Sequence, residues 1–121
     1  MANILVIDDD DLMRATLRYL LEPAGYSVLE ASDGKEGVEI YNKKAADLII
    51  TDVMMPGNSG IEVLEKLRRD NPDVKIIVIS GGSRDDAADM LRMAKILGAT
   101  KTFHKPIDKQ DILKAVQEAL S

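Results

Sequence analysis

The chain contains no cysteine and no tryptophan, and it has only one phenylalanine and three tyrosines among its 121 residues. Without cysteine, neither a disulfide framework nor a thiolate metal site can form. This composition is compatible with a reducing compartment, and we expect a soluble protein of the cytoplasm. The few aromatic side chains leave little to sandwich a flavin ring.

Long apolar runs and clusters of basic residues are absent as well. The N-terminal run from Ile4 to Ile7 has only four residues before it meets acids, which is too short for a signal peptide or a membrane span. Acidic residues number 21 and basic residues 16, giving a net charge of -5, and the lysines and arginines are scattered. A surface that binds a phosphate backbone is therefore not expected, and we predict no direct nucleic-acid or membrane partner.

What the chain does have is a composition typical of one globular domain. Apolar residues make up 45% and charged residues 31%. A chain of this length buries roughly two thirds of its unfolded surface in one core. We expect a single domain spanning residues 1 to 121, without an internal repeat or linker.

Short apolar runs alternate with segments of helical spacing. The runs are rich in β-branched residues and predict strands at residues 4–7, 26–29, 48–51, 75–80 and 100–103. Apolar stripes predict helices around residues 13–21, 61–67, 91–97 and 112–120, with a weaker one at 35–44, where Gly37 lowers the propensity. Gly25 and Gly98 suit left-handed caps after helices, and Ser83 stands at the head of the fourth helix.

This alternation predicts an α/β fold. Each crossover between parallel strands must be right-handed and must cover the sheet, so we expect a doubly wound (βα)5 protein. Its five-stranded parallel sheet would have the order 2-1-3-4-5, which is flavodoxin-like. In such sheets ligands bind at the carboxyl ends of strands 1 and 3.

Acidic residues cluster where those two strands end. Asp8, Asp9, Asp10 and Asp11 follow the first strand, and Asp52 ends the third. Crowded carboxylates raise one another's pKa unless a cation holds them. A set of oxygen ligands without Cys or His favours Mg²⁺, which commonly works beside a phosphate. Either Asp10 or Asp11 is better explained as a helix N-cap.

Two further groups follow the fourth and fifth strands. The hydroxyl of Ser80 precedes two glycines, so a phosphoryl oxygen could approach the backbone there. Lys105 offers an ammonium that can pair with Asp52 in the resting state or with a phosphoryl group later. Pro106 after it permits a cis peptide bond.

Together these residues resemble the response-regulator receiver domain of two-component phosphorelay signalling, of the chemotaxis-regulator type. The resemblance covers essentially the whole chain. Its parts are Asp8-Asp9, the stretch Asp52-Val-Met-Met-Pro56 followed by Gly60, Ser80-Gly81, and Lys105-Pro106. Each part falls at the carboxyl end of a predicted strand, in the expected order.

The resemblance implies a phosphoprotein that takes one phosphoryl group and is no enzyme acting on separate substrates. Asp52 would accept the group from a sensor histidine kinase or a histidine phosphotransfer protein and become an aspartyl phosphate. By the same resemblance, Mg²⁺ would be held by Asp8, Asp9, Asp52 and the backbone carbonyl of Met54. Ser80 and Lys105 would contact the phosphoryl oxygens.

The signalling switch departs from the family's pattern. The family couples the hydroxyl at the Ser80 position to an aromatic residue on the fifth strand, but here Thr102 stands at that place, three residues before Lys105. Phe103 alternates to the other sheet face, where we expect it in the core. We expect a smaller rearrangement of Thr102, with a downstream protein or output domain bound by the face of the fourth helix, fifth strand and fifth helix. His104, the only histidine, should point away from Lys105.

An enzyme remains the alternative from another class. Asp8-x-Asp10 after an apolar strand matches the nucleophile motif of Mg²⁺-dependent haloacid-dehalogenase-type phosphatases. Against this, Leu12 stands where that motif has Thr or Val, and the chain is short for a substrate cap. A flavodoxin-like cofactor binder fits less well, because the acids after the first strand would repel its phosphate.

Overall fold

The computed structural model describes residues 2–55, 58–81 and 84–121. Its strands are β1 (Asn3–Ile7), β2 (Ser27–Ala31), β3 (Leu48–Asp52), β4 (Met54–Met55), β5 (Asn58–Ser59), β6 (Lys75–Ser80) and β7 (Lys101–His104). Its helices are α1 (Asp11–Leu21), the 3₁₀ turn η1 (Glu22–Ala24), α2 (Gly34–Lys43), α3 (Gly60–Asp70), α4 (Arg84–Ile96) and α5 (Lys109–Leu120). The expectations that involve Gly82 and Ser83 fall outside the described residues.

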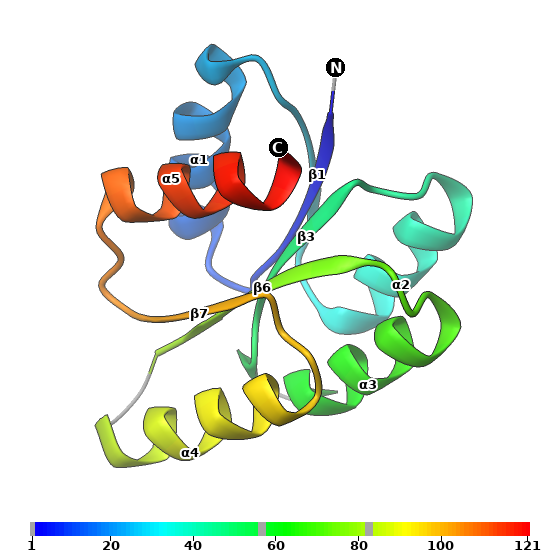
Figure 1. Cartoon of the computed structure of the whole chain (residues 1–121), viewed down its shortest axis with the longest axis vertical. Coiled ribbons are helices and arrows are strands. Elements are labelled where there is room, and N and C mark those ends of the chain that lie inside the picture. The colour runs from blue at the N-terminus through cyan, green and yellow to red at the C-terminus, as the bar shows by residue number, and fades with distance from the viewer. Residues whose placement is uncertain (1, 56–57, 82–83) are drawn as a thin grey trace.

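The main sheet has five parallel strands in the order β2-β1-β3-β6-β7. This is the predicted order 2-1-3-4-5, and each predicted strand lies within two residues of the observed one. Helices α1 and α5 cover one face of the sheet, and α2, α3 and α4 cover the other (Figure 1). A short antiparallel pair, β4 with β5, follows β3 and was not predicted.

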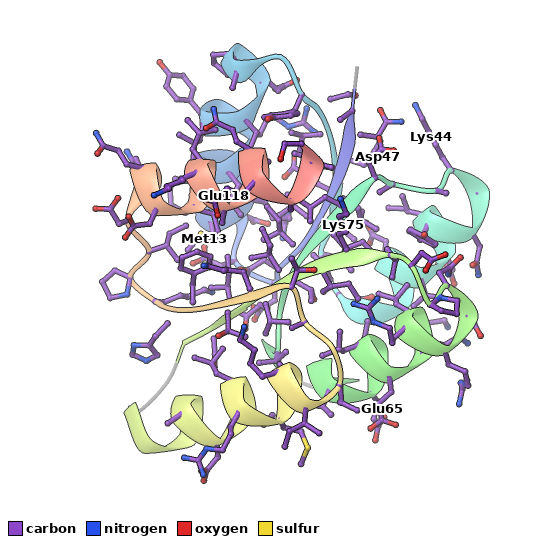
Figure 2. The ribbon with its side chains drawn as sticks, in the orientation of Figure 1. Met13, Lys44, Asp47, Glu65, Lys75 and Glu118 are labelled. Carbon is purple, nitrogen blue, oxygen red and sulfur yellow. The ribbon has the colours of Figure 1, made fainter. Side chains whose placement is uncertain are left out.

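Two apolar cores form because the central strands bury both faces. Leu5, Ile7 and Ile49 pack toward α2, α3 and α4, whereas Ile4 and Val6 pack toward α1 and α5. Side chains fill the space on both sides of the sheet (Figure 2). Every residue of β3 is buried, which agrees with its continuous apolar run. The strand that ends in Asp52 thus lies in the middle of the molecule.

The ends of the helices confirm two expectations about local sequence. Asp10 is the N-cap of α1, where its carboxylate accepts hydrogen bonds from the backbone N–H groups of Leu12 and Met13. Gly25 and Gly98 have φ angles of 99° and 95°, in the left-handed region that favours glycine.

Two further positions bear on the packing of the sheet. Phe103 packs against the core on the α1 and α5 side, as its alternation with Thr102 predicted. Gly37 in α2 lies so close to β1 that an added Cβ would sit 2.4 Å from Cδ1 of Ile7. The glycine that weakened the helix prediction is therefore explained by the tight contact between α2 and the sheet.

Candidate functional site

The carboxyl edge of the sheet collects the polar groups that the sequence singled out. Asp8 directly follows β1, Asp52 ends β3, Ser80 ends β6, and Lys105 directly follows β7. These strands are neighbours in the sheet, so residues far apart in the sequence reach one edge. The parallel topology alone accounts for their convergence.

Backbone hydrogen bonds continue the strand ladders into this edge. The N–H of Asp8 donates to the carbonyl of Ala31 at 3.1 Å, and the N–H of Lys105 donates to the carbonyl of Ser80 at 2.8 Å. The peptide bond between Lys105 and Pro106 is cis, which proline permits. Asp8 and Lys105 are thus fixed by sheet-like bonds although they lie outside the strands.

Three carboxylates form a compact acidic group. One oxygen from each of Asp8, Asp9 and Asp52 lies within 4.8 Å of the other two. Asp8 and Asp52 are only 2% and 3% exposed, whereas Asp9 faces solvent. The acidic group is therefore accessible to solvent on the side of Asp9.

Lys105 lies between the two buried acids. Its Nζ is 2.7 Å from Oδ2 of Asp52 and 3.1 Å from Oδ2 of Asp8. The pairing with Asp52 was predicted. The contact with Asp8 was not, because the sequence does not show which carboxylates one ammonium can reach.

The pKa values of this cluster shift in directions that its burial and charges explain. Burial raises the pKa of Asp8, and the charge of Asp52 raises it further, which outweighs the N–H of Asp10 and the ammonium of Lys105. Burial alone would lower the pKa of Lys105, but its hydrogen bonds and charge pairing with Asp52 and Asp8 raise it. The lysine therefore stays charged, while burial beside Asp52 disfavours the ionised form of Asp8.

This donor set fits a divalent cation. Carboxylate oxygens from three residues meet, two of them buried, and no nitrogen or sulfur ligand is among them. Hard oxygen ligands of this kind suit Mg²⁺ and Ca²⁺ better than softer metals. The raised pKa of Asp8 gives the physical reason, because a cation would relieve the repulsion between Asp8 and Asp52.

The remaining predicted site residues take different positions. Ser80 is fully buried, and its hydroxyl donates to the carbonyl of Gly81 at 3.2 Å. Thr102 is half-buried and pairs in register with Val78 of β6, two residues before Ser80. Met54 lies in β4, two residues after Asp52. His104 is exposed.

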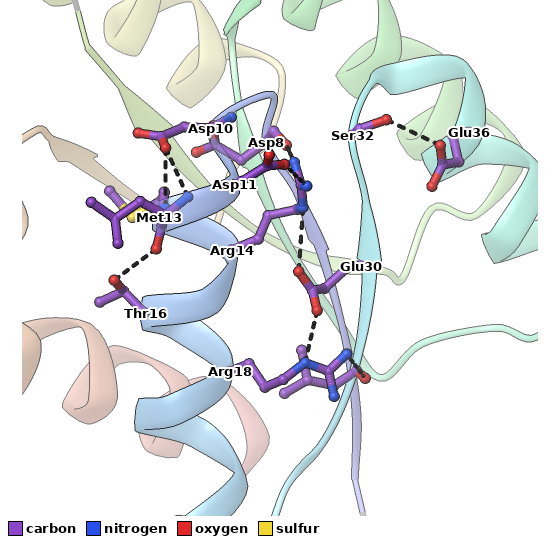
Figure 3. Close-up of polar contacts among 12 residues, drawn as sticks. Asp8, Asp10, Asp11, Met13, Arg14, Thr16, Arg18, Glu30, Ser32 and Glu36 are labelled. Atoms are coloured by element: carbon purple, nitrogen blue, oxygen red, sulfur yellow. Dashed lines mark hydrogen bonds and ion pairs between the residues drawn. The ribbon is translucent and has the colours of Figure 1, made fainter.

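Sequence reasoning missed Arg14. Its guanidinium donates to the backbone carbonyl of Asp8 and to the carboxylate of Asp11, and it pairs with Glu30 of β2 (Figure 3). The spacing of Asp11 and Arg14 by three residues on a helix was the only signal in the sequence. The bond to Asp8 depends on the fold of the loop after β1.

Comparison with known proteins supports the family resemblance that the sequence motifs indicated. The response regulator receiver domain family matches residues 4–117. Sporulation initiation phosphotransferase F of Bacillus subtilis is 31% identical over 118 residues, which cover 98% of this chain and 93% of that protein. Protein PilH of Pseudomonas aeruginosa is 31% identical over 121 residues, which cover 100% of this chain and 99% of that protein.

Solved structures agree with this. A response regulator receiver domain protein from Clostridium thermocellum superposes with a TM-score of 0.90 at 33% identity, covering 99% of this chain and 94% of that one. The chemotaxis response regulator CheY4 of Vibrio cholerae gives a TM-score of 0.86 at 30% identity, with 99% of both chains covered. Among the described residues, no helix has the length and apolar character needed to cross a membrane. The fold, the acidic group and these matches together show that the chain belongs to the response regulator receiver domain family.

Proposed function

We propose that the chain is a phosphoacceptor of two-component signalling, in which Asp52 receives a phosphoryl group in the presence of Mg²⁺. The observation that carries this proposal is the meeting of three carboxylates with one ammonium, Lys105, at the carboxyl edge of the sheet. The phosphoryl donor would be a sensor histidine kinase or a histidine phosphotransfer protein, met in the cytoplasm. Residues 1–121 would act as one receiver domain.

The residues at this edge suit phosphoryl transfer, which depends mainly on positioning and on neutralising charge. An oxygen of the Asp52 carboxylate attacks phosphorus, the bond from phosphorus to the donor's imidazole nitrogen breaks, and the electron pair stays on that nitrogen. Nζ of Lys105 lies 2.7 Å from Oδ2 of Asp52, so after the transfer it would be close enough to pair with the phosphoryl oxygens instead. The hydroxyl of Ser80, at the end of the neighbouring strand β6, would turn from the Gly81 carbonyl to donate to one of them.

Asp8, Asp9, Asp52 and the backbone carbonyl of Met54 would hold the Mg²⁺. When bound, the ion supplies positive charge beside the transferred group and neutralises the buried acids. The short distances among the three carboxylates support the side-chain part of this ligand set.

The proposal is tested by incubating the chain with a small acyl phosphate and Mg²⁺ and measuring its intact mass. We expect one added phosphoryl group on the parent and none on Asp52→Asn. Omitting Mg²⁺ should suppress the labelling of the parent.

The same experiment distinguishes the phosphatase alternative. Receiver domains are typically signalling modules without separate substrates, whereas a phosphatase with Asp8 as nucleophile would release phosphate over many turnovers. Labelling that persists in Asp52→Asn, or sustained release of phosphate by that variant, would contradict the proposal and favour the enzyme.

For output, we propose that the phosphorylated chain binds a downstream protein or output domain through α4, β7 and α5. Met93 and Ile96 of α4 are 47% and 75% exposed, so α4 carries apolar side chains without cover in the single chain. Ser80 and Thr102 would form the switch, because Ser80 lies at the site and its strand, β6, pairs with β7, which carries Thr102. The small Thr102 would move less than the family's aromatic residue.

A further inference from the structure

The peptide unit between Asp8 and Asp9 joins two of the three acids at the site. Its carbonyl, that of Asp8, accepts a hydrogen bond from Nη1 of Arg14. On the other side of the same residue, the N–H of Asp8 donates to Ala31 of β2. If this peptide rotated, the side chains of Asp8 and Asp9 would both move, so the bond from Arg14 bears directly on how the acidic group is arranged.

Arg14 is itself held in one orientation. Its side chain is only 13% exposed, and all three of its nitrogens are engaged (Figure 3). Nη1 donates to the Asp8 carbonyl, Nη2 to the carboxylate of Asp11, and Nε to Oε1 of Glu30 at 3.3 Å. A planar guanidinium with three directed bonds fixes its acceptors far better than a single ammonium could.

Glu30 provides the outer support for Arg14. It lies in β2 opposite Val6 of β1, and its second oxygen accepts a hydrogen bond from Nε of Arg18 at 2.7 Å. Arg18 follows Arg14 by one turn of α1 and also donates to the carbonyl of Val28. Among the described residues, the polar contacts of Arg18 are with Glu30, the carbonyl of Val28 and Glu22. Arg18 therefore binds Glu30, as Arg14 does, but does not contact the acids after β1.

From this geometry we infer that Arg14 is a positioning residue for the Mg²⁺ site, which acts by fixing the peptide between Asp8 and Asp9. This inference rests on the proposed function, because it takes these acids as ligands of Mg²⁺. Among the described residues, the polar side-chain contacts of Arg14 are with the Asp8 carbonyl, Asp11 and Glu30, and none of these atoms is a proposed ligand oxygen. Partners that orient metal ligands typically contribute about 10-fold or more to metal affinity.

The sign of the effect separates positioning from simple charge. Arg14 is a cation near the acids, so its removal would strengthen Mg²⁺ binding if charge were its whole contribution. A positioning role predicts the opposite, because the acids would lose their fixed arrangement.

The test is an NMR-monitored titration with Mg²⁺ alone, at constant ionic strength, of the parent, Arg14→Met, Arg14→Lys and Arg18→Met. We expect Arg14→Met to bind Mg²⁺ about 10-fold more weakly, and Arg14→Lys about 3-fold more weakly although it keeps the charge. Arg18→Met should match the parent within about 2-fold, even where its loss of stability equals that of Arg14→Met. If Arg14→Met does not fold, the comparison of Arg14→Lys with Arg18→Met decides.

A second readout measures the labelling of Asp52 by an acyl phosphate as a function of Mg²⁺ concentration. Saturating Mg²⁺ should restore the parent rate in Arg14→Lys, because Asp52 and Lys105 are untouched and only the metal affinity has changed. Unchanged or tighter Mg²⁺ binding by the Arg14 variants would overturn the inference while leaving the proposed function intact. A parent chain that binds no Mg²⁺ would overturn both.

Discussion

Asp8 is a carboxylate whose surroundings disfavour its ionised form. Its pKa is raised by burial and by the charge of Asp52, so the folded chain keeps a proton to higher pH than the unfolded chain does. The protonated form favours folding fully below the ordinary pKa of 3.8, and this advantage is lost as the pH rises through the raised folded value. At neutral pH, ionised Asp8 therefore lowers the free energy of unfolding.

We predict that Asp8→Asn stabilises the metal-free chain at pH 7 by about 1 kcal/mol, because a buried charge is replaced by a neutral group of the same shape. Denaturant unfolding at several pH values measures this. The gain should shrink as the pH falls toward 3.8. The same change at exposed Asp73 should have little effect at any pH, and an Asp8→Asn variant less stable than the parent at pH 7 would contradict the prediction.

At the scale of single residues, the sequence identified the groups that strand ends present and missed those that depend on side-chain reach. Asp8, Asp52 and Lys105 were found because parallel strands end at one edge. The bond from Arg14 to Asp8 was missed because it depends on the path of the loop after β1. The roles of these residues in phosphorylation stay predictions.

Helix α2 contains a residue of low helix propensity, Gly37, in its middle. Gly37 weakens the helix, but an added Cβ would lie 2.4 Å and 2.8 Å from Cδ1 and Cγ1 of Ile7, which is fully buried. Gly37 therefore allows α2 to pack closely against β1, which a residue with a Cβ would prevent.

We predict that Gly37→Ala destabilises the chain by about 1–2 kcal/mol, because overpacking against Ile7 exceeds the gain in helix propensity. Asn42→Ala, at an exposed position of the same helix, is the matched control and should stabilise by a few tenths of a kcal/mol to about 0.5 kcal/mol. Thermal unfolding of both variants measures the difference. A gain in stability from Gly37→Ala would show that Ile7 can move aside.

Elements α4 and β7 should carry the response to phosphorylation. We predict that treatment with an acyl phosphate and Mg²⁺ shifts backbone amide NMR signals over residues 84–102, because Ser80 and Thr102 lie on paired strands. Asp52→Asn treated in the same way gives the background. Signals that stay unchanged over this range in the phosphorylated parent would rule out the Thr102 switch.

The strands followed from the sequence to within two residues, because β-branched runs were strong. The helical stripes located the helices but not all of their ends: the stripe at 91–97 lies in α4, which begins at Arg84. The β4 and β5 pair was missed, since it has two residues per strand and forms no periodic pattern. Asp10, rather than Asp11, proved to be the N-cap of α1, a choice that only the backbone geometry could make. Gly37 was understood only once its distance to β1 was known.

For the molecule as a whole, Mg²⁺ binding should appear as added stability. A ligand that binds only the folded state at about 100 times its Kd raises the free energy of unfolding by about 2.7 kcal/mol. For a chain of this size we expect a rise in Tm of about 10 °C. Thermal scans with and without Mg²⁺ measure it.

Asp9→Asn is the control for this effect. Asp9 is exposed, so its neutralisation should change the metal-free stability little while removing one of the proposed ligands. A Tm that rises equally in the parent and in Asp9→Asn would indicate that Mg²⁺ acts elsewhere on the acidic chain.

Lys105 and Asp8 stand near opposite ends of the chain, yet their side chains meet. As the protein leaves the ribosome, both buried acids emerge long before the ammonium that pairs with them. A nascent or proteolytically clipped chain that ends before β7 has Asp8 and Asp52 but lacks the Lys105 ammonium that pairs with them. The two buried acids can therefore be paired only after Lys105 has been synthesised and has reached this edge of the sheet.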